Sequence, residues 1–217
     1  MNKKIMKKYL TIILITFLSF STFSQNSETA KNYLDDILKK VESYENISID
    51  FKYSLINEEE NISQSYKGNV FLKKEKYLVN LLGITNLFDG EKLYTINSED
   101  EEITISNASD EDDNINNPSK MLSFYKEGFT YIWDKKLPIN GRQIQYIKLI
   151  PIDSNSDDKH ILLGIDAVTK NMYNIITTGK NKTLTTLTVN SFKTNQPISE
   201  SLFIFDKNKY SNYYFNE

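Results

Sequence analysis

SYENISIDFKYSLI, residues 43–56, contains an abrupt change in the hydrophobic pattern of the chain. From Ile47 to Leu55, apolar residues alternate with polar ones, which is the period of a strand with one buried face. In residues 26–44 the apolar residues instead recur at helical spacing. The pattern therefore predicts an amphipathic helix that runs directly into the first strand of a sheet.

Strand-like segments continue to the end of the chain and are separated by turn sequences such as DGE, INGR and TGKN. About 10–11 strands in one antiparallel sheet imply strong curvature or closure. The last predicted strand is SLFIFD, residues 201–206, and the final KYSNYYFNE does not obviously complete another. No repeat with a period of about 20–50 residues stands out, which argues against a solenoid or a propeller.

One segment in the middle of the chain breaks the strand pattern. Residues 118–127 begin with Pro118, which suits the first position of a helix, and Gly128 suits the exit from it. The acidic residues before this segment are expected to form a solvated hairpin. Two helices with apolar faces, one N-terminal and one mid-chain, are expected to cover the open side of the curved sheet.

The N-terminus has the order of a cleavable signal peptide. Four lysines precede a short apolar run from about Tyr9 to Phe20, and small residues follow it up to Ser24. The run is too short to span a bilayer as a helix, which takes roughly 20 residues. We expect residues 1–24 to be removed and residues 25–217 to form a single exported domain.

The composition excludes several classes of function. Cysteine is absent, so no lipid anchor can be attached at the signal-peptide junction, and disulfides and thiolate chemistry are excluded. After cleavage, 22 basic residues face 29 acidic ones, and the net charge of −7 gives no reason to expect binding to nucleic acid or anionic lipid. We expect a soluble monomer of the periplasm without a permanent membrane anchor.

Residues that commonly carry catalysis or bind metals are scarce. His160 is the only histidine, so a histidine-based triad and a multi-histidine metal site are excluded. Asp110, Asp112 and Asn114 match the opening of a calcium loop, but Ile115 stands where the loop needs glycine, and the closing glutamate is missing. Nucleotide-binding glycine loops and the G-x-S-x-G elbow are absent. The sequence predicts a protein that is not an enzyme and that holds no metal or cofactor.

The chemistry that remains is apolar and aromatic. A plain hydrophobic core is the default interpretation of each apolar residue. The functional alternative is that the curved sheet is not filled, and that the space beneath the helices receives an apolar ligand. Under that alternative the residues expected to line the cavity are Leu34, Leu38, Phe51, Tyr53, Val70, Leu72, Tyr77, Met121, Leu122, Phe124 and Tyr125.

The order of these elements resembles the outer-membrane lipoprotein carrier family, LolA, in particular its Bacteroidetes-type members. The resemblance covers most of residues 28–206. It rests on the ordered set GNVFLKK, LFDGEKLYTINSEDEEITIS, NPSKMLSFYKEGF, YIKLIPID, ILLGID and SFKTNQPISESLFIFD. Within this set, FDGEKLY, residues 88–94, and FIF, residues 203–205, weigh most.

The resemblance implies an incomplete, half-open antiparallel β-barrel with a helical lid, whose cavity shelters the acyl chains of lipoproteins as they cross the periplasm. It also implies an ATP-driven, ABC-type exporter in the inner membrane that loads the carrier, and an outer-membrane lipoprotein acceptor that unloads it. A periplasmic sensory or regulatory module of the same fold is an alternative, as is a carrier of another apolar ligand.

Lys74 stands where the better-known branch of the family has an arginine that bonds the lid and holds the empty cavity shut. Lysine has three donors but lacks the planar fork of arginine, so a latch at this position would be less well defined. Lys74 is therefore a candidate latch residue, and an ordinary solvated charge at the end of a strand is the other interpretation.

Overall fold

The computed structural model describes residues 26–107 and 123–216. Within these ranges the chain forms a single sheet in the order β12-β6-β5-β4-β3-β2-β1-β11-β10-β9-β8-β7. Neighbouring strands are antiparallel except for the parallel pair β12 and β6. The strands are β1 Asn46–Asn57, β2 Ile62–Lys73, β3 Lys76–Leu81, β4 Ile84–Phe88, β5 Lys92–Asn97, β6 Glu102–Asn107, β7 Phe129–Ile139, β8 Arg142–Pro151, β9 Asp158–Asp166, β10 Met172–Gly179, β11 Leu184–Thr194 and β12 Tyr214–Asn216.

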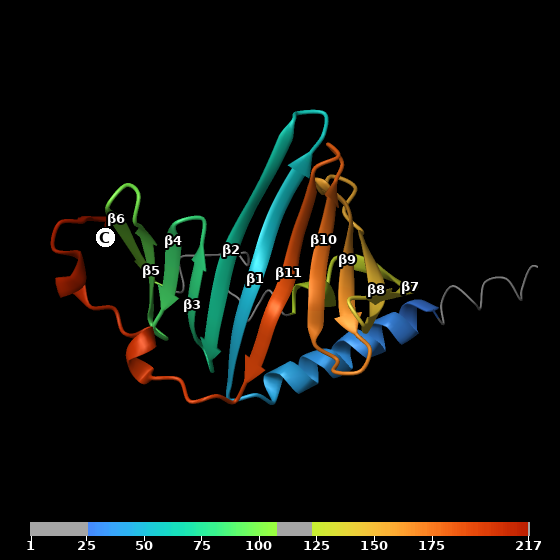
Figure 1. The fold of residues 1–217 in the computed structure, drawn as a ribbon, viewed down its shortest axis with the longest axis horizontal. Helices are drawn as coiled ribbons and strands as arrows, with labels where there is room; N and C mark the ends of the chain where they lie inside the picture. The colour runs from blue at the N-terminus through green and yellow to red at the C-terminus, as the bar shows by residue number, and fades with distance from the viewer. Residues whose placement is uncertain (1–25, 108–122, 217) are drawn as a thin grey trace, which may run out of the picture.

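The predicted half-open fold is confirmed. The sheet curves strongly, and a helix crosses it at the end formed by β7 to β10 (Figure 1). It holds 12 strands, slightly more than the 10–11 predicted, and its outermost strands β7 and β12 do not pair with each other. The sheet is therefore an open, curved layer and not a closed barrel.

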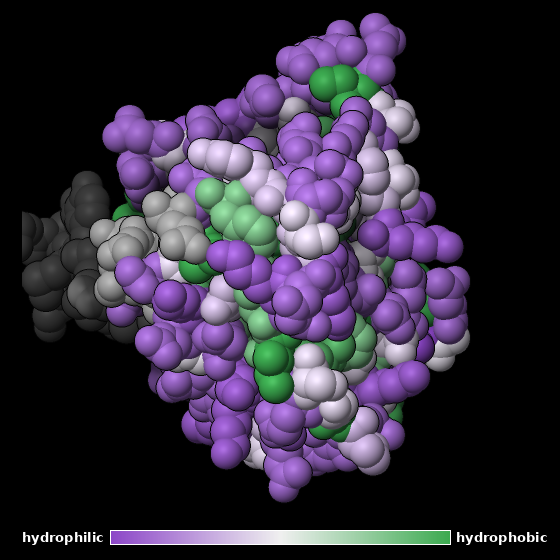
Figure 2. Space-filling view, turned by 90° about the vertical axis from the view of Figure 1, so that its left-hand side faces the viewer, coloured by the Kyte–Doolittle hydropathy of each residue, from purple (hydrophilic) through white to green (hydrophobic). Residues whose placement is uncertain are grey.

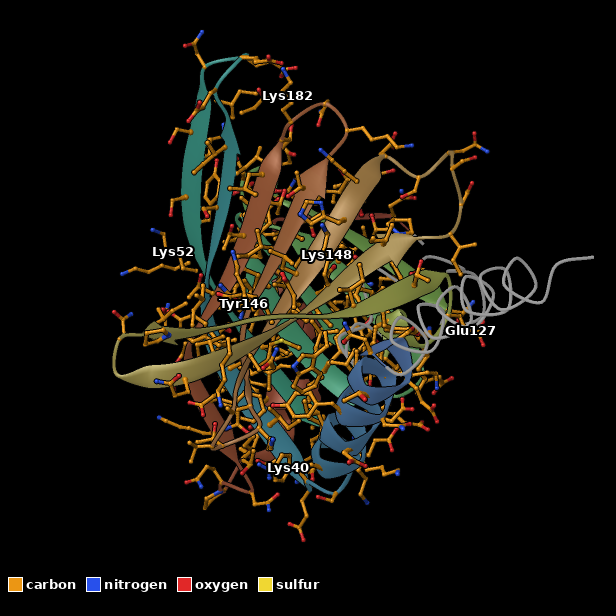
Figure 3. All side chains as sticks on the ribbon, turned by 90° about the vertical axis from the view of Figure 1, so that its right-hand side faces the viewer. Lys40, Lys52, Glu127, Tyr146, Lys148 and Lys182 are labelled. Atoms are coloured by element: carbon orange, nitrogen blue, oxygen red, sulfur yellow. The ribbon has the colours of Figure 1, made fainter. Side chains whose placement is uncertain are left out.

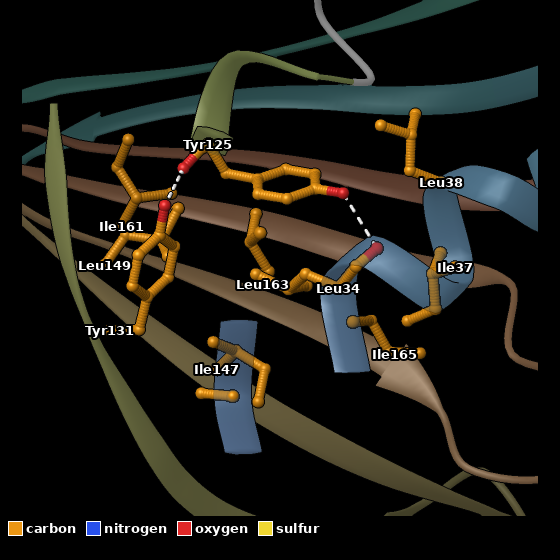
Figure 4. Close-up of a cluster of buried hydrophobic side chains, with 11 residues drawn as sticks. Leu34, Ile37, Leu38, Tyr125, Tyr131, Ile147, Leu149, Ile161, Leu163 and Ile165 are labelled. Atoms are coloured by element: carbon orange, nitrogen blue, oxygen red, sulfur yellow. Dashed lines mark hydrogen bonds between the residues drawn. The ribbon is translucent and has the colours of Figure 1, made fainter. Parts of the chain in front are cut away.

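Residues 26–42 form the predicted N-terminal helix. Its apolar stripe, which includes Ala30, Leu34, Ile37 and Leu38, is buried against the sheet (Figure 4). Burial of each of the three larger side chains, Leu34, Ile37 and Leu38, contributes roughly 1.5–3 kcal/mol, so the stripe holds the helix in place. The sheet residues in this core are Tyr131, Ile147, Leu149, Ile161, Leu163 and Ile165.

The face of the sheet that carries the helix is called the inner face below, and the opposite one the outer face. Because side chains alternate along each strand, the register assigns every strand residue to one of them. A second core lies on the inner face beyond the end of the helix, and its buried residues are Ile47, Leu72, Tyr77 and Leu93. Val41 is the helix residue that packs against this core, and Tyr44, two residues after the end of the helix, also packs against it.

The FDGEKLY segment forms the hairpin between β4 and β5. Asp89 accepts hydrogen bonds from the backbone N–H groups of Glu91 and Lys92, each at 2.8 Å, and from the Tyr94 hydroxyl at 3.2 Å. Gly90 has a φ of +105°, which favours glycine. The residues that weigh in the family resemblance thus have a structural role in closing this turn.

The C-terminal segment differs from its prediction. The expected strand at residues 201–206 is a 3-10 turn, η2 Glu200–Phe203, followed by extended chain, and a second turn, η3 Lys207–Tyr210, precedes β12. Phe203 is fully buried, and the Phe205 ring stacks on Tyr94, which lies on the outer face, at 4.2 Å between centroids. The alternation of apolar residues in 201–206 thus serves to pack the segment across the outer face of β3 to β6.

From the end of the sheet where β6 and β12 lie, the surface is mainly hydrophilic, with hydrophobic side chains gathered near its middle (Figure 2).

Several predictions fall on residues outside the described ranges. The signal peptide, residues 1–24, and the acidic calcium-like loop at 110–121 lie there, as do Met121 and Leu122. Of the predicted mid-chain helix, the described part contains only a 3-10 turn, η1 Phe124–Lys126, and Gly128 after it has a φ of +84°. In the described part of the chain no helix combines the length and the apolar character that crossing a membrane requires.

Candidate functional site: an apolar surface on the inner face of the sheet

The 3-10 turn η1 with the preceding Ser123, residues 123–126, is the described part of the predicted mid-chain helix and is called the lid turn below. Two tyrosines, one in the lid turn and one in β7, fix the N-terminal helix to the sheet. The Tyr125 hydroxyl, in η1, donates a hydrogen bond to the carbonyl oxygen of Leu34 in the helix at 2.7 Å. The Tyr131 hydroxyl, in β7, donates to the carbonyl oxygen of Tyr125 at 2.5 Å and to that of Lys126 at 3.1 Å (Figure 4). Burial raises the pKa of both phenols, so they remain protonated donors at neutral pH. The two tyrosines tie the lid turn to the helix on one side and to the sheet on the other.

Further contacts hold both ends of the helix on the same half of the sheet. At its start, the backbone N–H of Trp133 donates to the Asn26 side chain at 3.2 Å. At its end, Lys40 Nζ donates to the carbonyl oxygen of Thr169 in the turn between β9 and β10 at 2.5 Å, and Figure 3 shows Lys40 beside this end of the helix. All of these contacts are with β7 or the β9–β10 turn. Among the described residues, comparable hydrogen bonds between the helix and the inner face of β1 to β5 are therefore absent.

A pocket of about 310 Å³ lies where the helix ends above β1 and β2, and we call it the helix-end pocket. Its apolar and aromatic lining comes from the end of the helix, the chain that follows it, and the two strands. Polar side chains from the same segments and from the lid turn complete the lining. The lining residues are Leu38, Val41, Glu42, Tyr44, Glu45, Asn46, Ile47, Leu72, Lys74, Ser123 and Lys126.

The inner face continues from this pocket as a band of half-buried apolar side chains on β1 to β4 and β11. These residues pack against the second core but keep part of their surface exposed, unlike the closed core beneath the helix. They are Ile49, Val70, Val79, Phe88 and Phe192. The pocket and this band together form one apolar surface of the kind that a hydrocarbon ligand requires.

The structure distributes the predicted cavity residues over different environments. Leu34 and Tyr125 belong to the closed core beneath the helix. Leu38 and Leu72 line the helix-end pocket. Phe51 and Tyr77 are buried, whereas Tyr53, Val70 and Phe124 are half-buried.

Lys74 borders the helix-end pocket together with Ser123 and Lys126 of the lid turn. It occupies the two-residue turn between β2 and β3 with a φ of +55°, and its side chain is exposed. Among the described residues no hydrogen bond joins Lys74 to the lid turn. The neighbouring Lys73 instead pairs with Glu200 at 2.5 Å, and this pairing lowers the pKa of the Glu200 carboxyl.

Several pocket residues were not predicted from the sequence. Val41 and Tyr44 were assigned to the apolar stripe of the helix, Ile47 to the first strand, and Lys126 to the mid-chain helix. Their common role depends on where the helix ends relative to β1, which is a long-range property of the fold. A signal did exist, because apolar residues on both sides of a sharp helix-to-strand corner must lie close together.

A second pocket, of about 580 Å³, lies at the upper end of β3. It is lined by residues of β1 to β4 and β11, by the turn between β3 and β4, and by the residue after β5: Asp50, Phe51, Lys67, Gly68, Asn69, Asn80, Leu81, Leu82, Gly83, Ile84, Thr85, Ser98 and Asn190. Asn80 Nδ2 donates to Asn69 Oδ1 at 2.8 Å, and the Thr85 hydroxyl donates to Asn80 Oδ1 at 2.6 Å. Because Phe51, Leu81, Leu82 and Ile84 also line it, this pocket, like the helix-end pocket, combines apolar and polar groups.

Titratable clusters are sparse in the described residues. They contain no group of three or more His, Cys, Asp or Glu side chains placed to hold a metal ion. His160 lies on β9, within 3.4 Å of the Thr178 hydroxyl, and burial together with the charge of Lys148 lowers the pKa of its imidazole. Figure 3 labels Lys148, on β8 beside β9. These residues lie apart from the two pockets, since neither pocket is lined by any of them.

Known proteins resemble this chain in fold. An uncharacterized conserved protein from Thermus thermophilus matches with a TM-score of 0.56 and 8% identity, over 84% of this chain and 95% of that one. LprF from Mycobacterium bovis matches with a TM-score of 0.50 and 12% identity, over 80% and 96%. A LolA superfamily protein from Nitrosomonas europaea matches with a TM-score of 0.43 and 13% identity, over 80% and 98%.

No protein-family model matches the sequence, and neither does any curated protein. At these identities the likeness concerns the fold alone, and the function is argued from the residues of the inner face.

Proposed function

We propose that the mature protein, residues 25–217, is a periplasmic carrier that shelters the acyl chains of lipoproteins on the inner face of its open sheet. The observation that carries this proposal is the helix-end pocket, where Leu38, Val41, Ile47 and Leu72 border a space of about 310 Å³. The pocket opens to solvent at the end of the helix, and its apolar wall suits a protein that takes up hydrocarbon.

The size of the pocket sets how much of a chain it can hold. At roughly 30 Å³ per methylene-sized group, the half-open pocket corresponds to on the order of ten methylene groups, some of which would stay in contact with solvent. Burying ten of them contributes about 8 kcal/mol at ~0.8 kcal/mol each. An acyl chain of about 16 carbons needs more room, and the half-buried band at Ile49, Val70 and Phe192 extends the apolar surface in the direction of β11 and β3.

Uptake of further chains requires the lid to move. The helix is fastened to β7 and to the β9–β10 turn, so separation of the lid turn from the helix would widen the pocket without disturbing the β1–β5 half of the sheet. In this scheme Leu38 and Leu72 contact the ligand, and Lys74 lies at the border of the pocket. Leu34 and Tyr125 act as the packed support of the lid.

The carrier works without chemistry on its cargo. Residues 1–24 direct export and are removed, an ATP-driven exporter of the inner membrane supplies the acylated cargo, and an outer-membrane acceptor receives it. Leaving an acyl chain of about 16 carbons in water costs on the order of 12 kcal/mol, so transfer must be direct, from cavity to cavity.

The test is binding of a fluorescent fatty-acyl probe and of a purified lipoprotein to residues 25–217. Val41→Asp places a charge at the apolar border of the pocket, where Val41 is half-buried. We expect at least about tenfold weaker binding, because a charge beside a buried hydrocarbon is strongly unfavourable. The melting temperature should change little, since the side chain is partly exposed.

Ile176→Asp is the matched control. Ile176 is also half-buried, but it lies on the outer face of β10, because its neighbour Ile175 packs against the core of the inner face. It should retain full binding of both ligands. Two results would show that the pocket is not the ligand site. In one, both variants lose binding only in proportion to the folded protein that they lose, and in the other, neither variant changes binding. Binding of the acyl probe without any binding of the lipoprotein would assign the site to another apolar ligand.

A further inference from the structure

Strand β2 is longer than the strand beside it. It pairs with β1 along its whole length, from Asn57 opposite Ile62 to Asn46 opposite Lys73. On its other side, the ladder with β3 covers only residues 69–73. Figure 1 shows the upper part of β2 rising beyond β3. In the described part of the chain, residues 62–68 therefore present an unpaired strand edge.

The direction of the backbone groups on this edge follows from the hairpin between β2 and β3. Its turn has two residues, so Lys73 and Lys76 form the hydrogen-bonded closing pair. Because groups of alternate residues point to alternate sides of a strand, the N–H and C=O groups of Ser63, Ser65 and Lys67 point toward the open edge. None of the described residues accepts or donates a backbone hydrogen bond there.

The pocket of about 580 Å³ lies at the lower end of this open edge, and Lys67, Gly68 and Asn69 form part of its wall. Gly68 marks the point where β3 leaves the ladder. A Cβ on Gly68 would lie 2.7 Å from Cε2 of Phe51 and 2.8 Å from the carbonyl oxygen of Asn80, so only glycine fits between them. The edge and the pocket are thus continuous.

The same strand also carries part of the apolar inner face. Val70 belongs to the half-buried band of that face and lies two residues from Gly68, a distance of about 7 Å along a strand. A ligand with a hydrocarbon portion on the inner face and an attached polar chain would therefore have this edge directly in its path.

We propose that the free edge of β2 binds an extended peptide segment as an added strand. Residues of the peptide at one end of this strand would enter the pocket of about 580 Å³. The inference rests on the proposed function, in which this segment is the polypeptide that follows the acylated N-terminus of the cargo. A row of N–H and C=O groups at strand spacing matches another extended backbone and neither a sugar nor a lipid. The side chains of Ser63 and Ser65 are small and exposed, so they leave the approach open.

The test compares two synthetic probes on residues 25–217. One is a dipalmitoylated cysteine followed by a ten-residue linker without charged residues, and the other is the same lipidated cysteine followed by a single residue. We expect the long probe to bind about tenfold more tightly, the gain expected from one to two net backbone hydrogen bonds. A long probe with alternate backbone nitrogens methylated should lose this gain.

Ser65→Pro removes an edge N–H without breaking the ladder to β1, because proline is tolerated where the N–H faces away from the sheet. It should bind both probes with the affinity of the short one. Val41→Asp should weaken both probes equally and leave their ratio at about ten. Hydrogen exchange at Ser63, Ser65 and Lys67 should slow on binding of the long probe only.

The possible results separate the two proposals. Equal affinity of the long and short probes for the unaltered protein would overturn strand addition while leaving the acyl site intact. A tenfold gain that persists in Ser65→Pro, with unchanged exchange at the edge, would also overturn it. If neither probe binds, the proposed function itself fails.

Discussion

Tyr125→Phe weakens the attachment of the lid turn to the helix and leaves the packing of the core unchanged. The substitution keeps the ring, which is buried beneath the helix, and removes the hydroxyl that donates to the carbonyl oxygen of Leu34 at 2.7 Å. Leu34 lies within the helix, where its carbonyl also serves the backbone ladder, so the loss is that of one net hydrogen bond, about 1 kcal/mol. For a domain of this size the melting temperature should fall by roughly 2–4 °C.

The same loss should favour the open lid. A ligand that is too large for the closed pocket binds fully only when the lid turn has left the helix, so its apparent affinity is set by the population of that open state. About 1 kcal/mol less for the closed state raises this population, and with it the affinity for a fluorescent acyl probe, by about fivefold. Fluorescence titration and thermal melting of the same preparation measure the two effects.

Tyr146→Phe is the control. Tyr146 is also buried, on the outer face of β8, and its hydroxyl accepts a hydrogen bond from Asn174 Nδ2 at 3.3 Å. Figure 3 shows Tyr146 on its strand, within the sheet. Its loss should lower the melting temperature by a similar amount and leave probe affinity unchanged. If both variants change affinity alike, or if Tyr125→Phe lowers the melting temperature without strengthening uptake, the lid argument is refuted.

Gly68→Ala should lower stability by about 1–3 kcal/mol, because its Cβ would lie 2.7 Å from Cε2 of Phe51 and 2.8 Å from the Asn80 carbonyl oxygen; a melting temperature equal to that of the unaltered protein would contradict this packing. Lys74→Ala should strengthen uptake of the acyl probe and slow release to an acceptor if Lys74 is the latch, and unchanged affinity and transfer would leave it a surface charge. EDTA should leave both melting and uptake unchanged, since the calcium-like loop that opens at Asp110 has Ile115 in place of its glycine and lacks the closing glutamate; a shift of many degrees would reveal a bound ion.

Much of the fold could be predicted because it follows from local period. The helical spacing before residue 44 and the alternation after Ile47 give the helix and β1 directly, and turn sequences separate the hairpins. Residues 201–206 were predicted wrongly because alternating apolar residues are equally suited to a strand and to a segment laid across the outer face. That choice depends on the aromatic partner Tyr94, over 100 residues away in sequence.

The site was only partly predictable for a related reason. The apolar character of Leu38 and Leu72 is visible in the sequence, but whether such a residue faces a filled core or a pocket depends on where the helix stops. Leu34, one turn earlier in the same stripe, is packed under Tyr125, whereas Leu38 reaches the pocket. The open edge of β2 was invisible for the same reason, since it arises from the unequal lengths of β2 and β3.

The most direct test of the account is to locate a bound acyl chain by paramagnetic broadening. A stearic acid with a nitroxide near its methyl end is titrated into ¹⁵N-labelled protein of residues 25–217, and amide signals are followed by NMR. If the helix-end pocket holds the chain, the amides of Val41, Ile47 and Leu72 should broaden most, and broadening should fall with distance along the sheet toward β12. Broadening centred on another part of the sheet, or none at saturating probe, would contradict the claim that this pocket holds acyl chains.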